Sequence, residues 1–256
     1  MPLIRINGHD VEYRQLGATA GRRDTIVMLH EGLGSTSLWR EFPEELAAAS
    51  GLAVLVYSRA GHGRSDPHPG GRQVDFMHAE ARVHLPALLD ALDVERPWLF
   101  GHSDGGSIAL IHAAEADRPV AGLIVLAPHV FVEAVTVEGI VATQARFADT
   151  DLAARLARHH NDAAAVFQAW SDIWMDPAFR RWNIERLLPR IECPVLAIQG
   201  RDDEYGTMEQ VEAIGRLTPG ARVLGLERCG HSPHRDQPRA VLEATVKFIA
   251  ERGVAP

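Results

Sequence analysis

The fold of this chain is decided at residues 98–110, which read WLFGHSDGGSIAL. Residues 98–102 form a short apolar run typical of a buried strand, and the residues from Ser107 onward have the pattern of a helix. Between the two stands the sequence Gly-x-Ser-x-Gly, centred on Ser103. A serine on a sharp strand-to-helix turn needs glycines two residues to either side, because Cβ atoms there would collide. We therefore predict that such a turn presents Ser103 as a nucleophile; the alternative is a plain glycine-rich connection.

Strand-like and helix-like segments alternate along most of the chain. The expected strands are residues 3–6, 11–16, 25–30, 52–58, 98–102, 120–126, 195–199 and 221–227, and the expected helices are residues 38–49, 75–92, 107–116, 209–217 and 238–252. This alternation predicts an α/β fold with a mostly parallel central sheet flanked by helices.

One long stretch departs from this alternation. Residues 129–189 contain helical patterns and no convincing strand, so we expect a helical cap inserted into a core made of residues 1–128 and 190–256. Within the cap, Ala163, Phe167, Trp170 and Trp174 share one helical face. Trp170 and Trp174 are therefore candidates for substrate binding, although aromatic residues at this spacing often form the core of a cap instead.

Composition narrows the class of protein. The 256 residues carry a net charge of -8, which argues against nucleic acid or an anionic membrane as a partner and is compatible with a neutral or cationic small-molecule substrate. Cys193 and Cys229 do not form a disulfide framework or a metal-binding pattern. No signal peptide or apolar run of about 18 residues is present, so we expect a cytoplasmic protein. A homo-oligomer is compatible with this composition.

A serine nucleophile needs a base to accept its proton and an acid to orient that base. Of the 13 histidines, His231 is the preferred base, because Cys-Gly-His-Ser-Pro lies between the last expected strand and the last helix. His234 is a nearby rival, and His159 and His160 are expected to be a solvated pair. The acid should follow the strand that ends at Gln199, where the adjacent residues Asp202, Asp203 and Glu204 all qualify.

A glycine-rich loop, His-Glu-Gly-Leu-Gly-Ser at residues 30–35, directly follows an expected strand. Such a loop can supply one backbone N–H of an oxyanion hole, and the N–H of Asp104 can supply the other. The alternative is a loop whose glycines serve only a turn. No sequence pattern indicates a metal or organic cofactor.

With these features in place, residues 3–252 resemble the α/β-hydrolase superfamily. The resemblance rests on HEGLGS at residues 30–35, SRAGHGRSD at 58–66, GHSDGG at 101–106, GRDD at 200–203 and GHSPH at 230–234. In that family the acid commonly lies three residues after the glycine that ends its strand, which implies Asp203. The oxyanion donor commonly lies two residues after the loop histidine, which implies Gly32.

The resemblance implies a hydrolase that cleaves a small carboxylic ester, thioester or lactone through an acyl-serine intermediate. The same Ser103, Asp203 and His231 could also serve a carbon–carbon bond hydrolase or a perhydrolase, and some relatives are small-ligand receptors. Carbon–carbon hydrolases often carry tryptophan after the catalytic histidine, where this chain has Ser232. Glu31 is a second departure, because many relatives have glycine there; it puts a carboxylate near the site.

Overall fold

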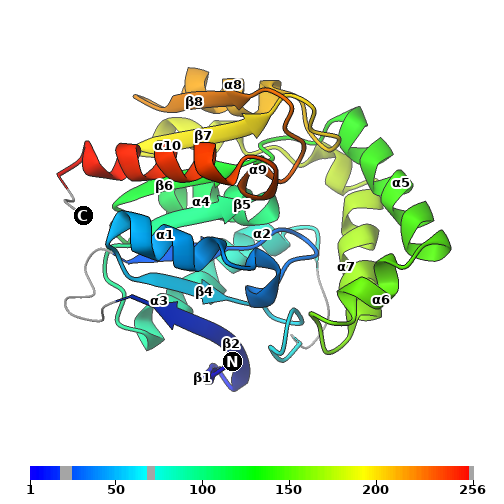
Figure 1. The fold of residues 1–256 in the computed structure, drawn as a ribbon. Coiled ribbons are helices and arrows are strands. Elements are labelled where there is room, and N and C mark those ends of the chain that lie inside the picture. The colour runs from blue at the N-terminus through cyan, green and yellow to red at the C-terminus, as the bar shows by residue number, and fades with distance from the viewer. Residues whose placement is uncertain (18–24, 68–72, 254–256) are drawn as a thin grey trace.

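A computed structural model describes residues 1–17, 25–67 and 73–253 and has a central sheet covered by helices on both faces (Figure 1). The strand order is β1-β2-β4-β3-β5-β6-β7-β8. The strands are β1 (Leu3–Ile6), β2 (His9–Leu16), β3 (Ile26–Leu29), β4 (Val54–Tyr57), β5 (Trp98–His102), β6 (Gly122–Leu126), β7 (Val195–Gly200) and β8 (Arg222–Leu226). The pairs β1–β2 and β2–β4 are antiparallel, whereas every other pairing is parallel. The predicted α/β fold with a mostly parallel sheet is confirmed.

The helices differ from the predicted ones mainly where they begin. They are α1 (Phe42–Ser50), α2 (Phe76–Ala79), α3 (Leu85–Ala91), α4 (Asp104–Glu115), α5 (Ala134–Asp149), α6 (Leu152–Leu156), α7 (Ala163–Met175), α8 (Glu209–Leu217), α9 (Pro233–Asp236) and α10 (Pro238–Ala250), with 3-10 turns η2 (Thr36–Trp39), η4 (Phe179–Arg181) and η5 (Glu185–Arg190) and a π-helical turn η3 (Glu80–His84). The helix expected from Ser107 already begins at Asp104, directly after the turn at Ser103.

The single helix expected over residues 75–92 is divided into α2, η3 and α3. Pro86 lies in the first turn of α3 and has no N–H to donate to the carbonyl four residues earlier, so a regular helix cannot run through it. A π-helical turn immediately before the proline accommodates this defect. Similarly, the helix expected from residue 38 starts at Phe42, with Pro43 in its first turn.

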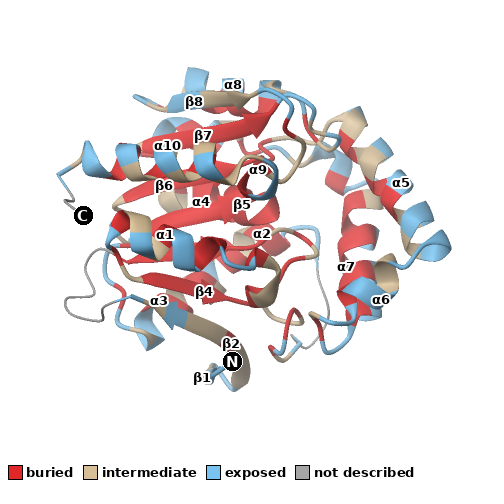
Figure 2. Cartoon of the chain, in the orientation of Figure 1, coloured by how far each residue is buried: buried red, intermediate tan, exposed pale blue. Residues whose placement is uncertain are grey.

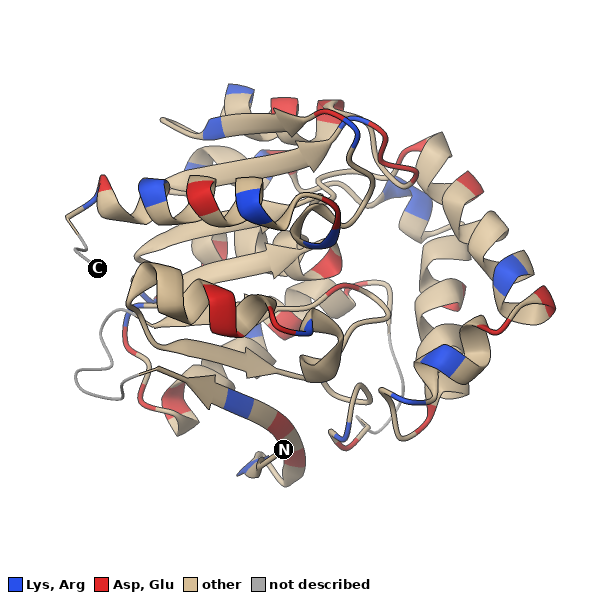
Figure 3. Cartoon of the chain, in the orientation of Figure 1, with Lys and Arg blue, Asp and Glu red and all other residues tan. Residues whose placement is uncertain are grey.

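The strands at the centre of the sheet are buried on both faces (Figure 2). Successive residues of β3 alternate between two apolar clusters: Ile26 and Met28 belong to one and Val27 and Leu29 to the other. The first cluster includes residues of α1 and α10, and the second includes residues of α3, α4 and α8. Figure 3 shows charged residues on the helices and loops, with none on β3 to β7. The sheet core is therefore apolar on both sides, as continuous apolar strands require.

Residues 129–189 run from the end of β6 toward the start of β7 and contain α5, α6 and α7, together with η4 and η5. These helices stand beside one end of the sheet, at the right of Figure 1. Phe167, Trp170 and Trp174 of α7 belong to the same apolar cluster as the sheet residue Leu29, so this segment shares its core with the sheet. No described helix is long and apolar enough to cross a membrane.

Candidate active site

Ser103 lies on a sharp turn between β5 and α4. Its φ angle of 52° is in the left-handed region, which non-glycine residues rarely adopt. The turn is held because the Ser103 N–H donates to the Leu126 carbonyl at 2.9 Å and the Ser103 carbonyl accepts from Ser107 N–H at 3.0 Å. A Cβ on Gly105 would lie 2.1 Å from the Leu29 carbonyl oxygen, and one on Gly101 would lie 2.3 Å from the Gly105 carbonyl oxygen. Glycine is therefore needed at both positions for α4 to approach the sheet.

Three loops that follow β5, β7 and β8 bring a serine, a carboxylate and a histidine together. The Ser103 Oγ lies 2.9 Å from the Nε2 of His231. On the other side of the ring, the Nδ1 of His231 lies 2.9 Å from each carboxylate oxygen of Asp203. This arrangement can transfer a proton from the hydroxyl to the imidazole while the carboxylate fixes the tautomer.

Asp203 is the member of the acidic run whose carboxylate reaches His231. Its side chain is 1% exposed and accepts further hydrogen bonds from the Tyr205 N–H at 2.8 Å and the Gln199 amide at 2.6 Å. Glu204 instead accepts a bond from the backbone N–H of His231 at 3.3 Å, and Asp202 is exposed. Gln199 was not among the predicted site residues; its one signal is a polar residue inside the otherwise apolar strand β7.

The electrostatics of the pair follow from burial and mutual attraction. Burial by itself would raise the pKa of the Asp203 carboxyl, but His231 and the Tyr205 N–H hold that pKa below its ordinary value. Burial would likewise lower the pKa of His231, yet the Asp203 carboxylate raises it above the ordinary 6.5. Asp203 is therefore ionised beside the imidazole, and His231 accepts a proton from Ser103 when its ring is neutral.

The loop at residues 30–35 places Gly32 beside the N-terminus of α4. A Cβ on Gly32 would lie 3.1 Å from a carboxylate oxygen of Asp104, so the two residues are neighbours. No residue in the described part of the chain accepts a hydrogen bond from the Gly32 N–H. The N–H of Asp104 belongs to the first turn of α4, whose donors find no acceptor within the helix. This arrangement suits binding of a developing oxyanion.

Three histidines contact successive carbonyl groups of this loop. His30 Nδ1 donates to the Glu31 carbonyl at 2.6 Å, His62 Nε2 lies 3.1 Å from the Gly32 carbonyl oxygen, and His160 Nε2 donates to the Leu33 carbonyl at 3.0 Å. The N–H and C=O of one trans peptide point in opposite directions. Holding the Glu31 carbonyl on the histidine side therefore directs the Gly32 N–H to the other side.

The expectation that His159 and His160 form a solvated pair is wrong. His160 is buried, and its Nδ1 accepts a hydrogen bond from the Gly63 N–H at 3.0 Å. Burial lowers the pKa of His160, so the neutral ring can accept at one nitrogen and donate at the other. His159 is half-buried and bonds the Ser37 hydroxyl at 2.8 Å. The sequence offers no signal for these contacts, because they join residues about a hundred positions apart.

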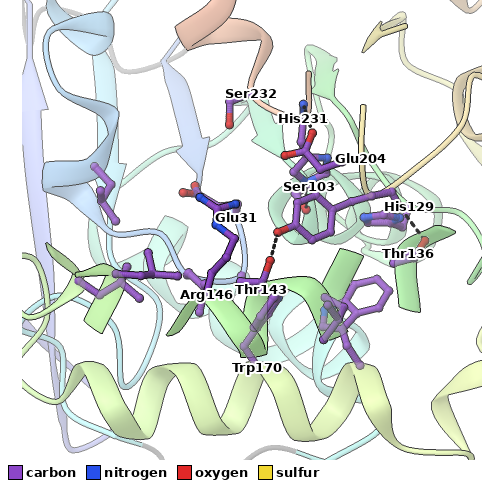
Figure 4. A pocket seen from close by; sticks show the side chains of 18 of the residues that line it. Glu31, Ser103, His129, Thr136, Thr143, Arg146, Trp170, Glu204, His231 and Ser232 are labelled. Atoms are coloured by element: carbon purple, nitrogen blue, oxygen red, sulfur yellow. Dashed lines mark hydrogen bonds between the residues drawn. The ribbon is translucent and has the colours of Figure 1, made fainter. Parts of the chain in front are cut away.

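A cavity of about 270 Å³ opens onto Ser103 and His231 (Figure 4). Gly32 lines it, and so do Trp170 and Trp174 of α7. Trp170 packs so closely on Gly32 that a Cβ there would lie 2.2 Å from the indole. Trp174 packs against His129 with ring centroids 4.8 Å apart. Both tryptophans therefore line the cavity and also belong to the core that joins α7 to the sheet.

Two buried histidines near the candidate base, His234 and His102, make structural contacts. His234 does not reach Ser103; its ring packs against Trp39 and His102, and burial lowers its pKa well below the ordinary value. His102 was not among the predicted site residues. Its Nε2 donates to the backbone carbonyl of His231 at 2.7 Å and its Nδ1 lies 3.5 Å from the Glu31 carboxylate. His102 thus connects the backbone of His231 to the carboxylate of Glu31.

The chain is similar to several known proteins. A protein-family model described as alpha/beta hydrolase fold matches residues 24–187. A curated relative, the 2-hydroxy-6-oxononadienedioate/2-hydroxy-6-oxononatrienedioate hydrolase of Cupriavidus pinatubonensis, is 27% identical, with 96% of this chain and 94% of the relative covered. The enol-lactonase from Burkholderia xenovorans LB400 has a similar structure, with a TM-score of 0.77, 23% identity and coverage of 97% and 100%. A thermophilic esterase from Thermogutta terrifontis also has a TM-score of 0.77, with 21% identity and coverage of 98% and 99%. The two structural similarities show the fold.

Proposed function

Because this chain belongs to the α/β-hydrolase fold family, we propose that it is a serine hydrolase that cleaves a small carboxylic ester, thioester or lactone. One observation carries the proposal: Ser103, His231 and Asp203 form a continuous hydrogen-bonded chain whose serine end opens into a cavity. A hydroxyl, an imidazole and a carboxylate in this order are the requirements for acyl transfer to serine.

In the proposed mechanism the Ser103 Oγ attacks the substrate carbonyl while His231 Nε2 takes the hydroxyl proton. The negative charge that forms on the carbonyl oxygen is stabilised by the N–H groups of Gly32 and Asp104. When the tetrahedral intermediate collapses, the bond to the alcohol or thiol breaks and His231 returns the proton to that leaving group. Water then attacks the acyl-serine by the same route and releases the acid. Asp203 stays ionised and stabilises the imidazolium at each step.

The segment 129–189 is proposed to act as the cap of this cavity. Side chains from α5 and α7, among them Thr136, Ile140 and Trp170, line the cavity together with Ser103. A cap of this kind excludes water from the reacting groups and shapes the space for the acyl chain. Trp170 and Trp174 are proposed as its substrate-contacting residues, in addition to their packing role.

Substitution Ser103→Ala tests the proposal directly. With p-nitrophenyl butyrate as the substrate, we expect turnover to fall about 10⁶-fold, because the attacking group is lost while the turn and its glycines remain. A serine-directed phosphonate should add once per chain, on Ser103, as measured by mass spectrometry. Activity within tenfold of wild type, or an adduct on another residue, would contradict the serine mechanism.

A second candidate reaction is hydrolysis of a carbon–carbon bond in a 2-hydroxy-6-oxo compound. Its support is the curated relative from Cupriavidus pinatubonensis, which is named for such a compound and matches nearly the full chain. Against it stands Ser232, where carbon–carbon hydrolases often carry tryptophan. Direct comparison of kcat/KM for 2-hydroxy-6-oxononadienedioate and p-nitrophenyl butyrate separates the two: a higher value for the dioate would favour carbon–carbon cleavage.

A further inference from the structure

Arg146 is a solvent-exposed charged residue that lines the cavity and that the mechanism does not use. It lies in the last turn of α5 and extends into the cavity (Figure 4). Its guanidinium makes no hydrogen bond or ion pair with any residue that the structure describes. A basic residue near a helix C-terminus complements the helix dipole, but this effect does not require the side chain to line a cavity. An arginine fork without a partner is suited to a planar anion such as a carboxylate.

The other charged groups around the cavity are already engaged. The Glu31 carboxylate faces His102 at 3.5 Å and Arg235 at 3.9 Å, and Glu204 accepts from the His231 N–H. Among the cations, Arg235 donates to the Leu38 carbonyl at 3.0 Å and Arg155 lies 3.5 Å from Asp151.

The charge balance of the cavity differs from that of the whole molecule. The lining contains three arginines, at positions 146, 155 and 235, and two glutamates, at positions 31 and 204, and Arg155 is also matched by the nearby Asp151. The chain as a whole carries a net charge of -8. Arg155 and Arg235 each lie near a carboxylate, whereas Arg146 has no carboxylate partner among the described residues and is therefore the arginine available to an anionic group.

The groups around Arg146 divide into a polar and an apolar part. Thr143, one turn earlier on α5, is hydrogen-bonded to the Tyr205 hydroxyl, and both residues line the cavity. Ile140, Leu152 and Leu156 supply apolar lining. We propose that Arg146 binds a carboxylate at the end of the substrate remote from the scissile bond, while the apolar residues contact the intervening carbon chain. This inference rests on the proposed hydrolase function and names its substrate class: esters that carry a free carboxylate.

Matched substrates test the inference on the acyl side. We compare the mono-p-nitrophenyl ester of adipic acid with the mono-p-nitrophenyl ester of adipamic acid, which replaces the free carboxylate by a neutral amide of the same shape. The measured quantity is the ratio of kcat/KM for the carboxylate over the amide. We expect wild type to prefer the carboxylate by about 10- to 100-fold, the range that a charge-assisted hydrogen bond provides. Arg146→Ala should abolish the preference, and Arg146→Lys should retain part of it.

The control variant is Arg180→Ala. Arg180 belongs to the same segment and is exposed, as Arg146 is, but it does not line the cavity, so removing its charge should leave the preference as in wild type. If Arg146→Ala keeps the wild-type ratio, or if wild type prefers the amide, the inference is wrong. The pair 4-acetoxybenzoate and 4-acetoxybenzamide repeats the test with the carboxylate on the alcohol part of the ester. If only one of the two substrate pairs shows the preference, Arg146 binds a carboxylate on the part of the substrate that carries it in that pair.

A binding experiment keeps this inference separate from the proposed reaction. Ser103→Ala cannot form an acyl-serine, so calorimetry on this variant measures binding of adipate and adipamide alone. We expect adipate to bind more tightly, and the added substitution Arg146→Ala to remove the difference. If wild type hydrolyses none of the esters while adipate binding still depends on Arg146, the proposed function fails and the anion site stands. Equal adipate binding with and without Arg146 overturns the site itself.

Discussion

At the scale of single residues, the candidate site depends on which of two neighbouring carboxylates reaches the imidazole. Asp203 is 1% exposed and has three classes of donor around it: the imidazole, an amide side chain and a backbone N–H. Asp202 is exposed on the same turn. The short distance between the two along the chain makes them a matched pair for mutagenesis.

We predict that Asp203→Asn lowers turnover on the order of 10⁴-fold, because the amide favours the wrong tautomer of His231. Asp202→Asn removes an equal charge from the adjacent residue and should stay within a few-fold of wild type. Steady-state kinetics on p-nitrophenyl butyrate measures both. A larger loss for Asp202→Asn would show that the carboxylate seen beside His231 is not the one that orients it.

The pH dependence of kcat/KM follows from the charge of His231. The Asp203 carboxylate outweighs burial and raises the pKa of His231 above 6.5, so activity should decline with an apparent pKa above 6.5 as the pH falls and the imidazole is protonated. The neighbouring carboxylates of Glu204 and Glu31 act in the same direction. In Asp203→Asn the opposing effect of burial remains, so the residual activity should persist to lower pH. If the apparent pKa for the decline of kcat/KM at low pH is unchanged or higher in Asp203→Asn, this account is wrong.

At the scale of elements, the site arises because parallel strands end at the same edge of the sheet. β5, β7 and β8 point the same way, so the loops that follow them meet although Ser103 and His231 are 128 positions apart. In open parallel sheets this carboxyl edge is the usual place for a ligand. The approach of α4 to β3 sets how far Ser103 projects from that edge, and it depends on Gly105.

Two adjacent glycines of α4 test this packing. Gly105→Ala would place a Cβ 2.1 Å from the Leu29 backbone oxygen, which cannot move without displacing β3. We expect the free energy of unfolding to fall by about 3 kcal/mol or more, the upper range for overpacking. At Gly106 the nearest atom is the Pro128 Cβ at 3.0 Å, and alanine is the better helix former, so Gly106→Ala should stay within about 1 kcal/mol of wild type. Urea denaturation measures both; equal losses would mean that the approach of α4 is not what requires glycine.

At the scale of the whole molecule, two of the contacts that hold segment 129–189 to the rest of the protein connect it to the sheet core and to the loop at residues 30–35. Its α7 aromatic residues share the apolar cluster that covers one face of the sheet. At the connection between α6 and α7, His160 bonds both the Leu33 carbonyl and the Gly63 N–H, and the Asn161 N–H donates to the Gly63 carbonyl at 2.8 Å. The position of this segment is therefore coupled to the loop that carries Gly32.

His160→Ala tests the coupling. The substitution leaves the Leu33 carbonyl and the Gly63 N–H without their partner, and an unsatisfied buried polar group costs about 1–3 kcal/mol. We expect a lower free energy of unfolding and, because the loop carrying Gly32 is less firmly held, a larger change in kcat than in KM. His159→Ala, which removes a single bond to Ser37 at a less buried position, should have a smaller effect on both. Lost stability with an unchanged kcat would assign His160 a structural role only.

Several features of this protein follow from local sequence alone. The alternation of apolar runs and helical patterns predicts the strands and helices of the sheet region. A strand buried on both faces is a continuous apolar run, whereas a helix buried on one face has apolar residues every three or four positions. The turn at Ser103 is also recognisable locally, since its steric demands fall on glycines only two residues away. The structure corrected the start of two helices, at residues 42 and 104, divided the helix expected over residues 75–92 before Pro86, and shifted several strand ends by one or two residues.

Other features depend on contacts between distant parts of the chain and only the tertiary structure decided them. Adjacent acids such as Asp202 and Asp203 have the same local pattern, and their burial differs because only one faces the loop after β8. The contacts of His160 and the two-sided packing of Trp170 are likewise set by which residues the sheet edge brings near them. Local sequence records the period of a helix or strand and the steric limits of a turn. It does not record the partner across a folded interface, because that partner lies far away along the chain.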